Sequence, residues 1–342
     1  MSIAYAADPL LEQREPAQAA PAVVAVVEQP SRFEVLVRAI TRESEGVLSL
    51  TLARADGRPL PAWEPGAHVD LILPSGLERQ YSLCGDPSDA STWQVAVLRE
   101  LDSRGGSEWI HGELKDGDTL AVRGPRNNFP LVDAEHYLFI AGGIGITPLL
   151  PMIERVAART DRWRLLYGGR ERRFMAFSER LARHAERVDL RPQDEHGLLE
   201  LESLLRGVAE GAAVYCCGPE PLLQAVEQAS AHLPPGSLHV ERFRPREGAL
   251  DGENTAFEVV LDRSGITVQV AADQTILEAV EAAGVSLPTS CREGTCGTCE
   301  TEVLEGEIDH RDSFLTEAER EEGLTMQICC SRARSPRLVL DL

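Results

Sequence analysis

The hydrophobic and polar positions of the first third of the chain follow a short period. Between Arg32 and about Val132, brief stretches alternate in polarity or carry β-branched residues, and proline and glycine separate them. This pattern is typical of strands joined by tight turns. The expected strands cover 33–40, 47–53, 68–73, 80–83 and 94–98, with one helix near 107–114. The pattern predicts a small β-barrel over residues 31–132.

The period lengthens over residues 133–245, where apolar strands alternate with amphipathic stretches. The expected strands are 137–141, 163–167 and 212–217, and the expected helices are 148–158 and 220–231. Strands that alternate with helices favour a parallel α/β sheet.

Residues 246–254 are polar and contain two glycines, which is typical of a linker, and a third unit is expected over 255–342. Its first strands are predicted at 257–261 and 266–270. Thr275 with Glu278, and Thr316 with Glu319, match the capping box that begins a helix. The chain is therefore predicted to be multidomain.

Length, charge and composition limit the number of domains, the binding partners and the location that we expect. The chain has 342 residues, enough for two or three domains, and a formal net charge of −21. Such a charge argues against binding to nucleic acid or an anionic membrane. No apolar run approaches the roughly 20 residues that cross a bilayer, and the start lacks a signal-peptide pattern, so we expect a cytoplasmic protein. Residues 1–30 lack glycine and are rich in Ala, Pro, Glu and Gln, and we expect a flexible tail.

Five of the eight cysteines lie in the last fifth of the chain. Cys291, Cys296 and Cys299 follow the spacing C-x4-C-x2-C, and Cys329 follows after 29 intervening residues, which matches a plant-type [2Fe–2S] site. Structural zinc is the alternative, although zinc sites usually pair two short knuckles. Unligated core cysteines are another, and four at this spacing by chance are improbable. Cys330 is expected to be a neighbouring packed thiol.

Two glycine-containing turns end predicted parallel strands, where open α/β sheets bind ligands. The first turn carries Gly142, Gly143 and Gly145 and continues into Thr147 as N-cap and Pro148 in the first helical turn. Backbone N–H groups and the helix dipole at such a turn favour a pyrophosphate. The second turn carries Cys217, Gly218 and Pro219. A tight turn without a ligand is the alternative for the first turn, and simple core packing of Cys216 and Cys217 is the alternative for the second.

The barrel region contains two further short motifs. Arg79-Gln-Tyr-Ser82 lies on a predicted strand, and Arg104-Gly-Gly-Ser107 precedes the predicted helix as a possible phosphate cradle. A cross-strand Arg–Tyr pair is the alternative for the first motif. His68 is expected at a strand edge, and His310 in a structural role or near the partner face.

These motifs together resemble the phthalate dioxygenase reductase and vanillate demethylase reductase family. The resemblance runs through Cys291-Arg-Glu-Gly-Thr-Cys-Gly-Thr-Cys299, Asp309-His-Arg-Asp312 and Cys329-Cys-Ser-Arg332. It implies a flavin barrel, a nicotinamide domain similar to that of the ferredoxin–NADP reductase superfamily, and a C-terminal plant-type ferredoxin domain of the β-grasp type. It covers about residues 32–342.

The resemblance also implies a role for each motif. Tyr81 packs against the flavin, Ser82 approaches its reactive edge, and Arg79 meets phosphate. Gly105, Gly106 and Ser107 hold the phosphate of FMN, the flavin that this family uses, and Arg99 contacts the flavin. Cys217 lies beside the nicotinamide. Arg170 and Glu171 follow the second strand of the nicotinamide domain, where an arginine suits NADPH and an acid suits NADH; the resemblance favours NADH.

The implied activity is electron transfer from NADH through FMN and a [2Fe–2S] cluster to a separate Rieske-type terminal oxygenase. The family's oxygenases act on an aromatic or similar compound. A redox sensor whose output is binding, and a flavin reductase whose last domain holds zinc or no metal, are the alternatives. From residue 255 onward there are 17 acidic and 7 basic side chains, a balance that would attract a basic docking face.

Overall fold

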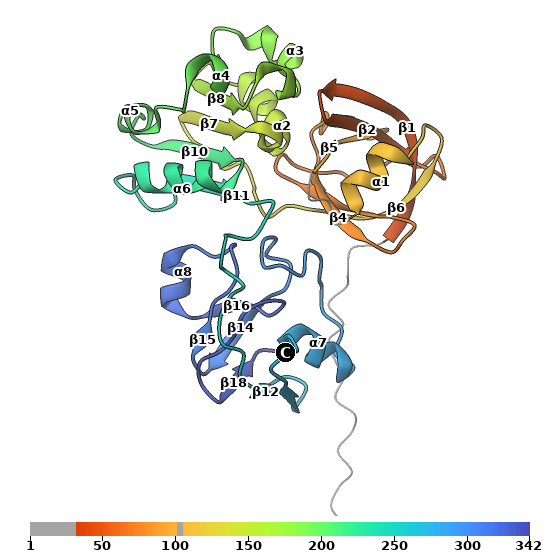
Figure 1. The fold of residues 1–342 in the computed structure, drawn as a ribbon, viewed down its shortest axis with the longest axis vertical. Coiled ribbons are helices and arrows are strands. Elements are labelled where there is room, and N and C mark those ends of the chain that lie inside the picture. Colours follow the sequence, from red (N-terminus) through yellow and green to blue (C-terminus); the bar gives the residue numbers. More distant parts are fainter. Residues whose placement is uncertain (1–31, 101–104) are drawn as a thin grey trace, which may run out of the picture.

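The computed structural model describes residues 32–100 and 105–342, so the predicted tail over 1–30 and Arg104 lie outside the described residues. The described elements form three sheets, of six, five and five strands, and a separate strand pair. Figure 1 shows the third sheet and its helices as a separate lobe beside the first two units. No helix among the described residues is both long and apolar enough to span a bilayer.

The first sheet is antiparallel and curls into a barrel. Its strands are β1 (Arg32–Ser44), β2 (Val47–Arg54), β3 (His68–Ile72), β4 (Glu78–Ser82), β5 (Trp93–Leu98) and β6 (Thr119–Arg126), in the order β4-β3-β6-β1-β2-β5. An antiparallel bridge between Leu83, just after β4, and Val95 of β5 joins the two edge strands. Helix α1 (Gly106–Gly112) precedes β6. The predicted barrel is confirmed, although the periodicity did not predict β6.

The second sheet is parallel throughout. It contains β7 (His136–Gly142), β8 (Trp163–Gly169), β9 (Val188–Pro192), β10 (Ala212–Cys217) and β11 (Leu238–Glu241), in the order β11-β10-β7-β8-β9. Helix α2 (Ile146–Ala157) follows β7, and α5 (Leu201–Arg206) and α6 (Glu220–Ala229) flank β10 in sequence. Phe139 of β7 packs in the core that contains α2, whereas Ile140 packs with α5 and α6. Alternate side chains of one strand thus pack into the cores on opposite faces of the sheet, as expected for a sheet that is covered on both sides.

The third sheet has the order β13-β12-β18-β14-β16. Its strands are β12 (Phe257–Leu261), β13 (Ile266–Val270), β14 (Glu300–Glu305), β16 (Thr325–Gln327) and β18 (Arg337–Leu340), and β15 (Ile308–Asp309) pairs with β17 (Arg332–Ala333). Helices α7 (Ile276–Ala282) and α8 (Glu317–Glu322) each begin with the predicted capping box, at Thr275 and Thr316. Both capping boxes are therefore confirmed.

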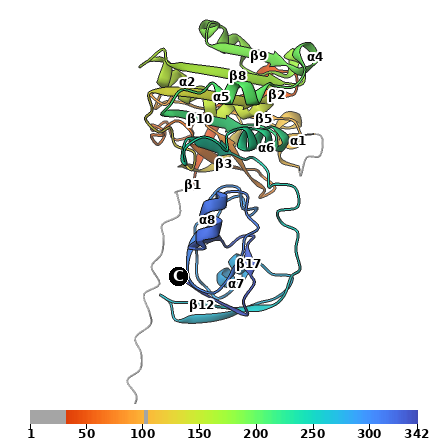
Figure 2. The same ribbon diagram turned by 90° about the vertical axis from the view of Figure 1, so that its left-hand side faces the viewer.

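The apolar cores show which units share an interior. One core cluster joins Val47, Cys84, Ala96 and Phe129 to residues of the parallel sheet and α2, so the barrel and the second unit pack on common apolar surface. In contrast, every residue of the third unit's core lies between Phe257 and Leu342. Figure 2 shows this third unit below the other two.

Candidate functional site

The cysteine loop lies between α7 and β14 and owes its shape to backbone in the left-handed region. Arg292 has φ 56°, Gly294 has φ 70° and Gly297 has φ 72°. A Cβ added at Gly294 would lie 2.4 Å from Cys330 Sγ, and one at Gly297 would lie 2.5 Å from the ring of Phe314. Both positions therefore require glycine.

The thiols of this loop converge with those of the turn that follows β16. Cys291 interacts with Cys296 and Cys329, and Cys329 interacts in turn with Cys299 and Cys330. The backbone N–H groups of Glu293 and Thr295 lie 3.4 Å from Cys291 Sγ and donate to it. Three of the four predicted ligands are buried, and Cys291 is partly accessible.

The electrostatics of this cluster fit a cationic centre between the sulfur atoms. The pKa of Cys291 lies well below its ordinary value because Cys296 and Cys329 donate to its sulfur, whereas contacts with Cys291 and Cys299 and burial raise the pKa of Cys329. Thiols this close cannot all ionise unless positive charge lies among them. The donor set, the amide donors and the glycine cradle therefore fit an iron–sulfur cluster.

The spacing of the ligands favours an iron–sulfur cluster over zinc, since three of the four predicted ligands lie on one loop, whereas zinc sites usually pair two short knuckles. A tetrahedral zinc site needs all its ligands around one point, whereas a two-iron cluster shares four thiolates between two irons. Cys330 is partly accessible and its sulfur lies 3.8 Å from the carbonyl oxygen of Gln327.

The two glycine turns of the parallel sheet lie directly against each other. A Cβ at Gly142 would lie 2.6 Å from Pro219 Cδ, and one at Gly145 would lie 2.2 Å from the carbonyl oxygen of Cys217. A Cβ added at Gly218 would in turn lie 3.0 Å from the Cα of Gly142. Only residues without a side chain allow the two strand ends to meet so closely.

The predicted N-cap role of Thr147 is wrong. A short 3-10 turn over Gly143–Gly145 precedes α2, so the helix begins at Ile146 and Thr147 is already inside it. Its hydroxyl donates to the carbonyl oxygen of Ile144 at 3.0 Å, which is a bond back to the turn rather than a cap. Pro148 does lie in the first helical turn. Gly143, with φ 54°, is partly accessible and has open space where a Cβ would be.

Cys217 is buried at the end of β10 beside a residue that the sequence did not indicate. Glu241 ends the neighbouring strand β11 in register with Cys217, and the Cys217 thiol donates to Oε2 of its carboxyl group at 3.9 Å. Burial raises the pKa of Glu241 to about 8, and burial together with Glu241 raises the pKa of Cys217. The carboxyl group is thus largely protonated at neutral pH. Strand pairing alone brings the two residues together.

Arg170 and Glu171 follow β8 at the same carboxyl edge of the sheet. Arg170 is exposed, and its carbonyl oxygen accepts a hydrogen bond from the Asp194 N–H at 3.2 Å. Glu171 is partly accessible and forms an ion pair with Arg173 at 2.9 Å. The preference for NADH over NADPH stays a prediction.

The barrel brings the two predicted flavin motifs together. Arg79 on β4 lies over the start of α1, because a Cβ at Gly106 would lie 2.8 Å from its Cγ. Gly105 has φ 89° and precedes α1, and the Ser107 hydroxyl accepts from the Glu100 N–H at 3.2 Å.

The remaining predicted flavin residues lie along β4 and at the end of β5. Ser82 is buried on β4 opposite His68, and burial raises the pKa of Tyr81. Arg99 follows β5 as an exposed residue whose N–H bonds to the Gly46 carbonyl oxygen. These placements fit a flavin whose phosphate meets Arg79 and the start of α1.

His68 lies at the start of a strand, and the role of His310 stays a prediction. His68 is the first residue of β3 and is buried, and burial with Arg126 nearby lowers its pKa to about 4. His310 Nδ1 lies 3.6 Å from Asp312 Oδ1.

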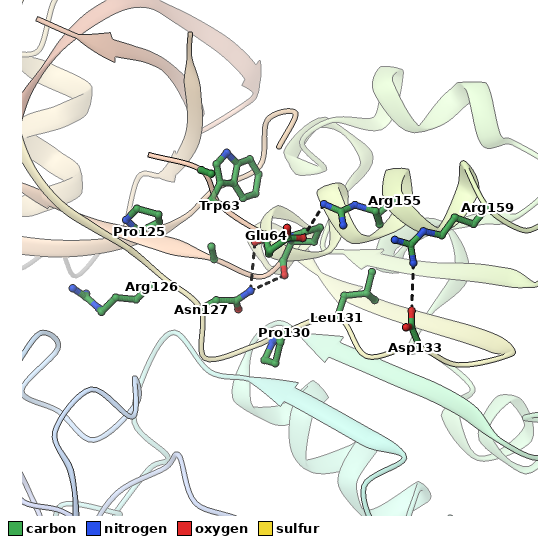
Figure 3. Close-up of a pocket in the computed structure, with 13 residues that line it drawn as sticks. Trp63, Glu64, Pro125, Arg126, Asn127, Pro130, Leu131, Asp133, Arg155 and Arg159 are labelled. Carbon is green, nitrogen blue, oxygen red and sulfur yellow. Dashed lines mark hydrogen bonds and ion pairs between the residues drawn. The ribbon is translucent and has the colours of Figure 1, made fainter. Parts of the chain in front are cut away.

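Figure 3 shows a hollow of about 530 Å³ between the barrel and the parallel sheet. It is bordered by the barrel segment around Trp63, the connection to β7 and one side of α2. Its charged groups neutralise one another: Arg155 pairs with Glu64 at 2.9 Å, and Arg159 pairs with Asp133 at 3.3 Å. It contains none of the predicted cofactor residues.

With this geometry in place, comparison with known proteins defines the class. The 2Fe-2S iron-sulfur cluster binding domain family matches residues 259–334, and the oxidoreductase NAD-binding domain family matches residues 139–228. The chain belongs to the family of oxygenase-system reductases that includes phthalate dioxygenase reductase and vanillate O-demethylase oxidoreductase. The resemblance found in the sequence is thereby confirmed.

Particular relatives cover nearly the whole chain. Phenoxybenzoate dioxygenase subunit beta of Ectopseudomonas oleovorans is 44% identical over 309 residues, which are 90% of this chain and 96% of that protein. The crystal structure of phthalate dioxygenase reductase is 36% identical with a TM-score of 0.66, covering 91% of this chain and 98% of that one. An intact type IV self-sufficient cytochrome P450 monooxygenase is 48% identical with a TM-score of 0.82, covering 91% of this chain. This chain spans only 41% of the length of the P450.

Proposed function

We propose that the protein is the reductase component of an oxygenase system. It passes electrons from NADH through FMN in the barrel and a [2Fe–2S] cluster to a separate Rieske-type terminal oxygenase, which acts on an aromatic or similar compound. The observation that carries the proposal is the seating of the cysteine loop on the barrel, where the Asn128 side chain donates to the backbone carbonyl of Cys296. This contact brings the predicted cluster site against the predicted flavin unit.

The proposed domains follow the sheets. The FMN domain covers residues 31–132, the NAD domain 133–245 and the ferredoxin domain 255–342, with a linker over 246–254. The separate core of the last unit supports the final boundary. The first boundary falls between β6 and β7, where the chain leaves the barrel for the parallel sheet.

The chain's own residues act in this proposal by placement rather than by acid–base chemistry. When bound, FMN accepts two electrons from NADH and the cluster takes electrons one at a time, which is the cofactors' own chemistry. Arg79 and the Gly105–Ser107 segment would hold the flavin phosphate, and the buried Ser82 would face the flavin edge. Cys217 would flank the nicotinamide, with Glu241 holding its proton beside it.

NADH is the proposed donor. Glu171 can accept a hydrogen bond from a ribose 2′-hydroxyl, whereas Arg170 would favour a 2′-phosphate. The NADH preference rests on family membership, and steady-state rates with NADH and NADPH test it directly. A rate with NADPH equal to that with NADH would reject the preference.

The cytoplasm is the proposed location, because cysteines clustered at the spacing of a metal site are typical of reducing compartments rather than of disulfide frameworks.

An anaerobic titration with NADH tests the proposed function. The visible spectrum of the purified protein should show both a flavin and an iron–sulfur absorbance, and NADH should bleach both. A flavin band that bleaches with no iron–sulfur absorbance would reject the cluster and leave a simple flavin reductase.

A second candidate acceptor is a haem monooxygenase. The self-sufficient P450 structure is 48% identical to this chain, compared with 36% for phthalate dioxygenase reductase, and has the higher TM-score. The two acceptors are distinguished by mixing the NADH-reduced protein with a P450 haem domain or with a Rieske oxygenase component. Faster reduction of the haem would replace the Rieske partner in the proposal.

A further inference from the structure

The third unit meets the barrel through polar groups. Among the described residues, none from before Phe257 belongs to its apolar core, so the two units share no apolar interior in this part of the chain. The contact is made instead by the residues just before and within the cysteine loop, which reach β3, β4 and the end of β6. Figures 1 and 2 show this lobe facing the barrel from two directions.

Ser290 lies at the centre of this contact. Its hydroxyl donates to Asp70 Oδ1 at 2.7 Å and accepts from Gln80 Nε2 at 2.6 Å and from Arg126 Nη2 at 2.8 Å. A serine hydroxyl has one donor and two acceptor positions. All three are used, each toward a different strand of the barrel.

The barrel side of the contact is a buried ion pair. Asp70 on β3 is fully buried, and its Oδ1 also accepts from Arg126 Nη2 at 2.6 Å. Arg123 on β6 lies 4.0 Å from the same carboxylate and donates to the Thr289 carbonyl oxygen at 3.5 Å. A buried carboxylate needs such partners, since an unpaired charge in this position would be costly. Ser290 thus adds a hydrogen-bond partner from the third unit to this ion pair between β3 and β6.

The placement of these residues in the sequence links the two cofactor motifs. Ser290 immediately precedes the predicted ligand Cys291, and Gln80 lies between Arg79 and Tyr81. The single hydrogen bond from Gln80 to Ser290 therefore joins the strand that carries the flavin motif to the loop that carries the cluster motif.

We propose that Ser290, Asp70, Arg126 and Gln80 form a docking clamp that fixes the cluster loop on the flavin strand. These are positioning residues: they hold the loop at one distance and orientation, and through it they set the rate of electron transfer between the two cofactors. The inference rests on the proposed function and extends it to the residues that align the two cofactor sites.

The first test measures docking itself and needs no turnover. In the holoprotein, Ser290→Ala removes two charge-assisted hydrogen bonds and the bond from Gln80. It should therefore speed amide hydrogen exchange in residues 288–297 and 78–82 by about tenfold or more, since one such bond is already worth about a factor of ten. Ser335→Ala is the matched control, because the Ser335 hydroxyl bonds only to backbone groups of Glu307 and Arg337 within the third unit. Equal exchange in the S290A variant and the wild type at both segments would overturn the clamp.

The second test separates positioning from general damage. In anaerobic stopped-flow mixing with NADH, S290A should reduce its flavin at the wild-type rate and its cluster about tenfold more slowly, because small misplacements of reacting groups cost rates of this order. The electron paramagnetic resonance spectrum of the reduced cluster should stay unchanged, and Ser290→Thr should restore the rate. Unchanged cluster reduction in S290A would reject the proposal.

A variant on the barrel side tests the clamp even if S290A fails to assemble its cluster. Asp70→Asn leaves all four predicted ligands and their loop intact and removes the charge that Ser290 and Arg126 share. It should also slow cluster reduction, and the double variant should be no slower than the more affected single variant, since the two residues act through one contact. Additive effects would show separate roles and reject the clamp. A wild-type protein without flavin or cluster absorbance would reject the proposed function, whereas intact wild-type absorbance with normal D70N kinetics rejects the clamp alone.

Discussion

Glu241→Gln is expected to stabilise the protein at neutral pH and to leave its stability unchanged near pH 4.5. The folded chain keeps the Glu241 proton up to about pH 8 because the carboxyl group is buried, whereas the ordinary pKa is 4.5. Below pH 4.5 both the folded and unfolded chains carry the proton. As the pH rises from there toward 8, the unfolded chain releases it first, so the wild type loses stability over this window.

The size of the effect follows from the distance between the pH and the ordinary pKa. At pH 7 this distance is about 2.5 pH units, and each unit corresponds to about 1.4 kcal/mol, so the wild type is expected to lose about 3 kcal/mol. Glutamine has nearly the same shape and stays neutral at every pH, so the variant should avoid this loss.

Urea unfolding followed by circular dichroism at pH 4.5, 6 and 7.5 measures the prediction. The difference between variant and wild type should be near zero at pH 4.5 and should grow with pH. Glu210→Gln, at an exposed position in the turn before β10, is the control and should show no such growth. A constant difference at all three pH values would mean that Glu241 is ionised in the folded chain, and the reasoning from its burial would be refuted.

Three further outcomes are expected. Cys329→Ser should abolish the iron–sulfur absorbance whereas Cys330→Ser should retain it; loss in both variants or in Cys330→Ser alone would reassign the fourth ligand. In Gly145→Ala the added Cβ would lie 2.2 Å from the Cys217 carbonyl oxygen, so the variant should be less stable by about 3 kcal/mol. Its flavin absorbance should no longer bleach with NADH but should still bleach with dithionite. Electron delivery from the reduced protein to a basic acceptor such as cytochrome c should slow as salt rises, because the last domain has 17 acidic and 7 basic side chains; a salt-independent rate would exclude steering.

The sequence predicted elements well where one physical signal dominated. Strands such as β7 and β10 are buried on both faces and therefore form continuous apolar runs, and the capping boxes at Thr275 and Thr316 mark helix starts by a local hydrogen-bond pattern. The missed strands lack such a signal. In β6 a Gly-Pro pair interrupts the pattern, and β14 alternates with glutamates on its exposed face. Thr147 was misplaced because an additional 3-10 turn precedes α2.

The candidate site divides in the same way. The cysteine spacing and the glycine turns are local patterns, and the sequence was sufficient to indicate them. Glu241 could not be predicted, since its position beside Cys217 depends on which strands become neighbours. The contact between Asp70 and Ser290 spans 220 residues of sequence. Its only local sign was an acidic residue within an otherwise apolar strand, which implies a buried partner but does not identify it.

The single covalent connection to the last unit has a consequence for how tightly its contact must bind. Because residues 246–254 tether the two parts, their association is intramolecular, and short flexible linkers give an effective concentration in the millimolar range. The polar contact around Ser290 therefore needs an intrinsic dissociation constant of only about 0.1 mM to keep the unit docked about nine-tenths of the time. An affinity this weak also allows fast release. The tether thus permits the third unit to dock alternately on the barrel and on an external acceptor, without a separate source of energy.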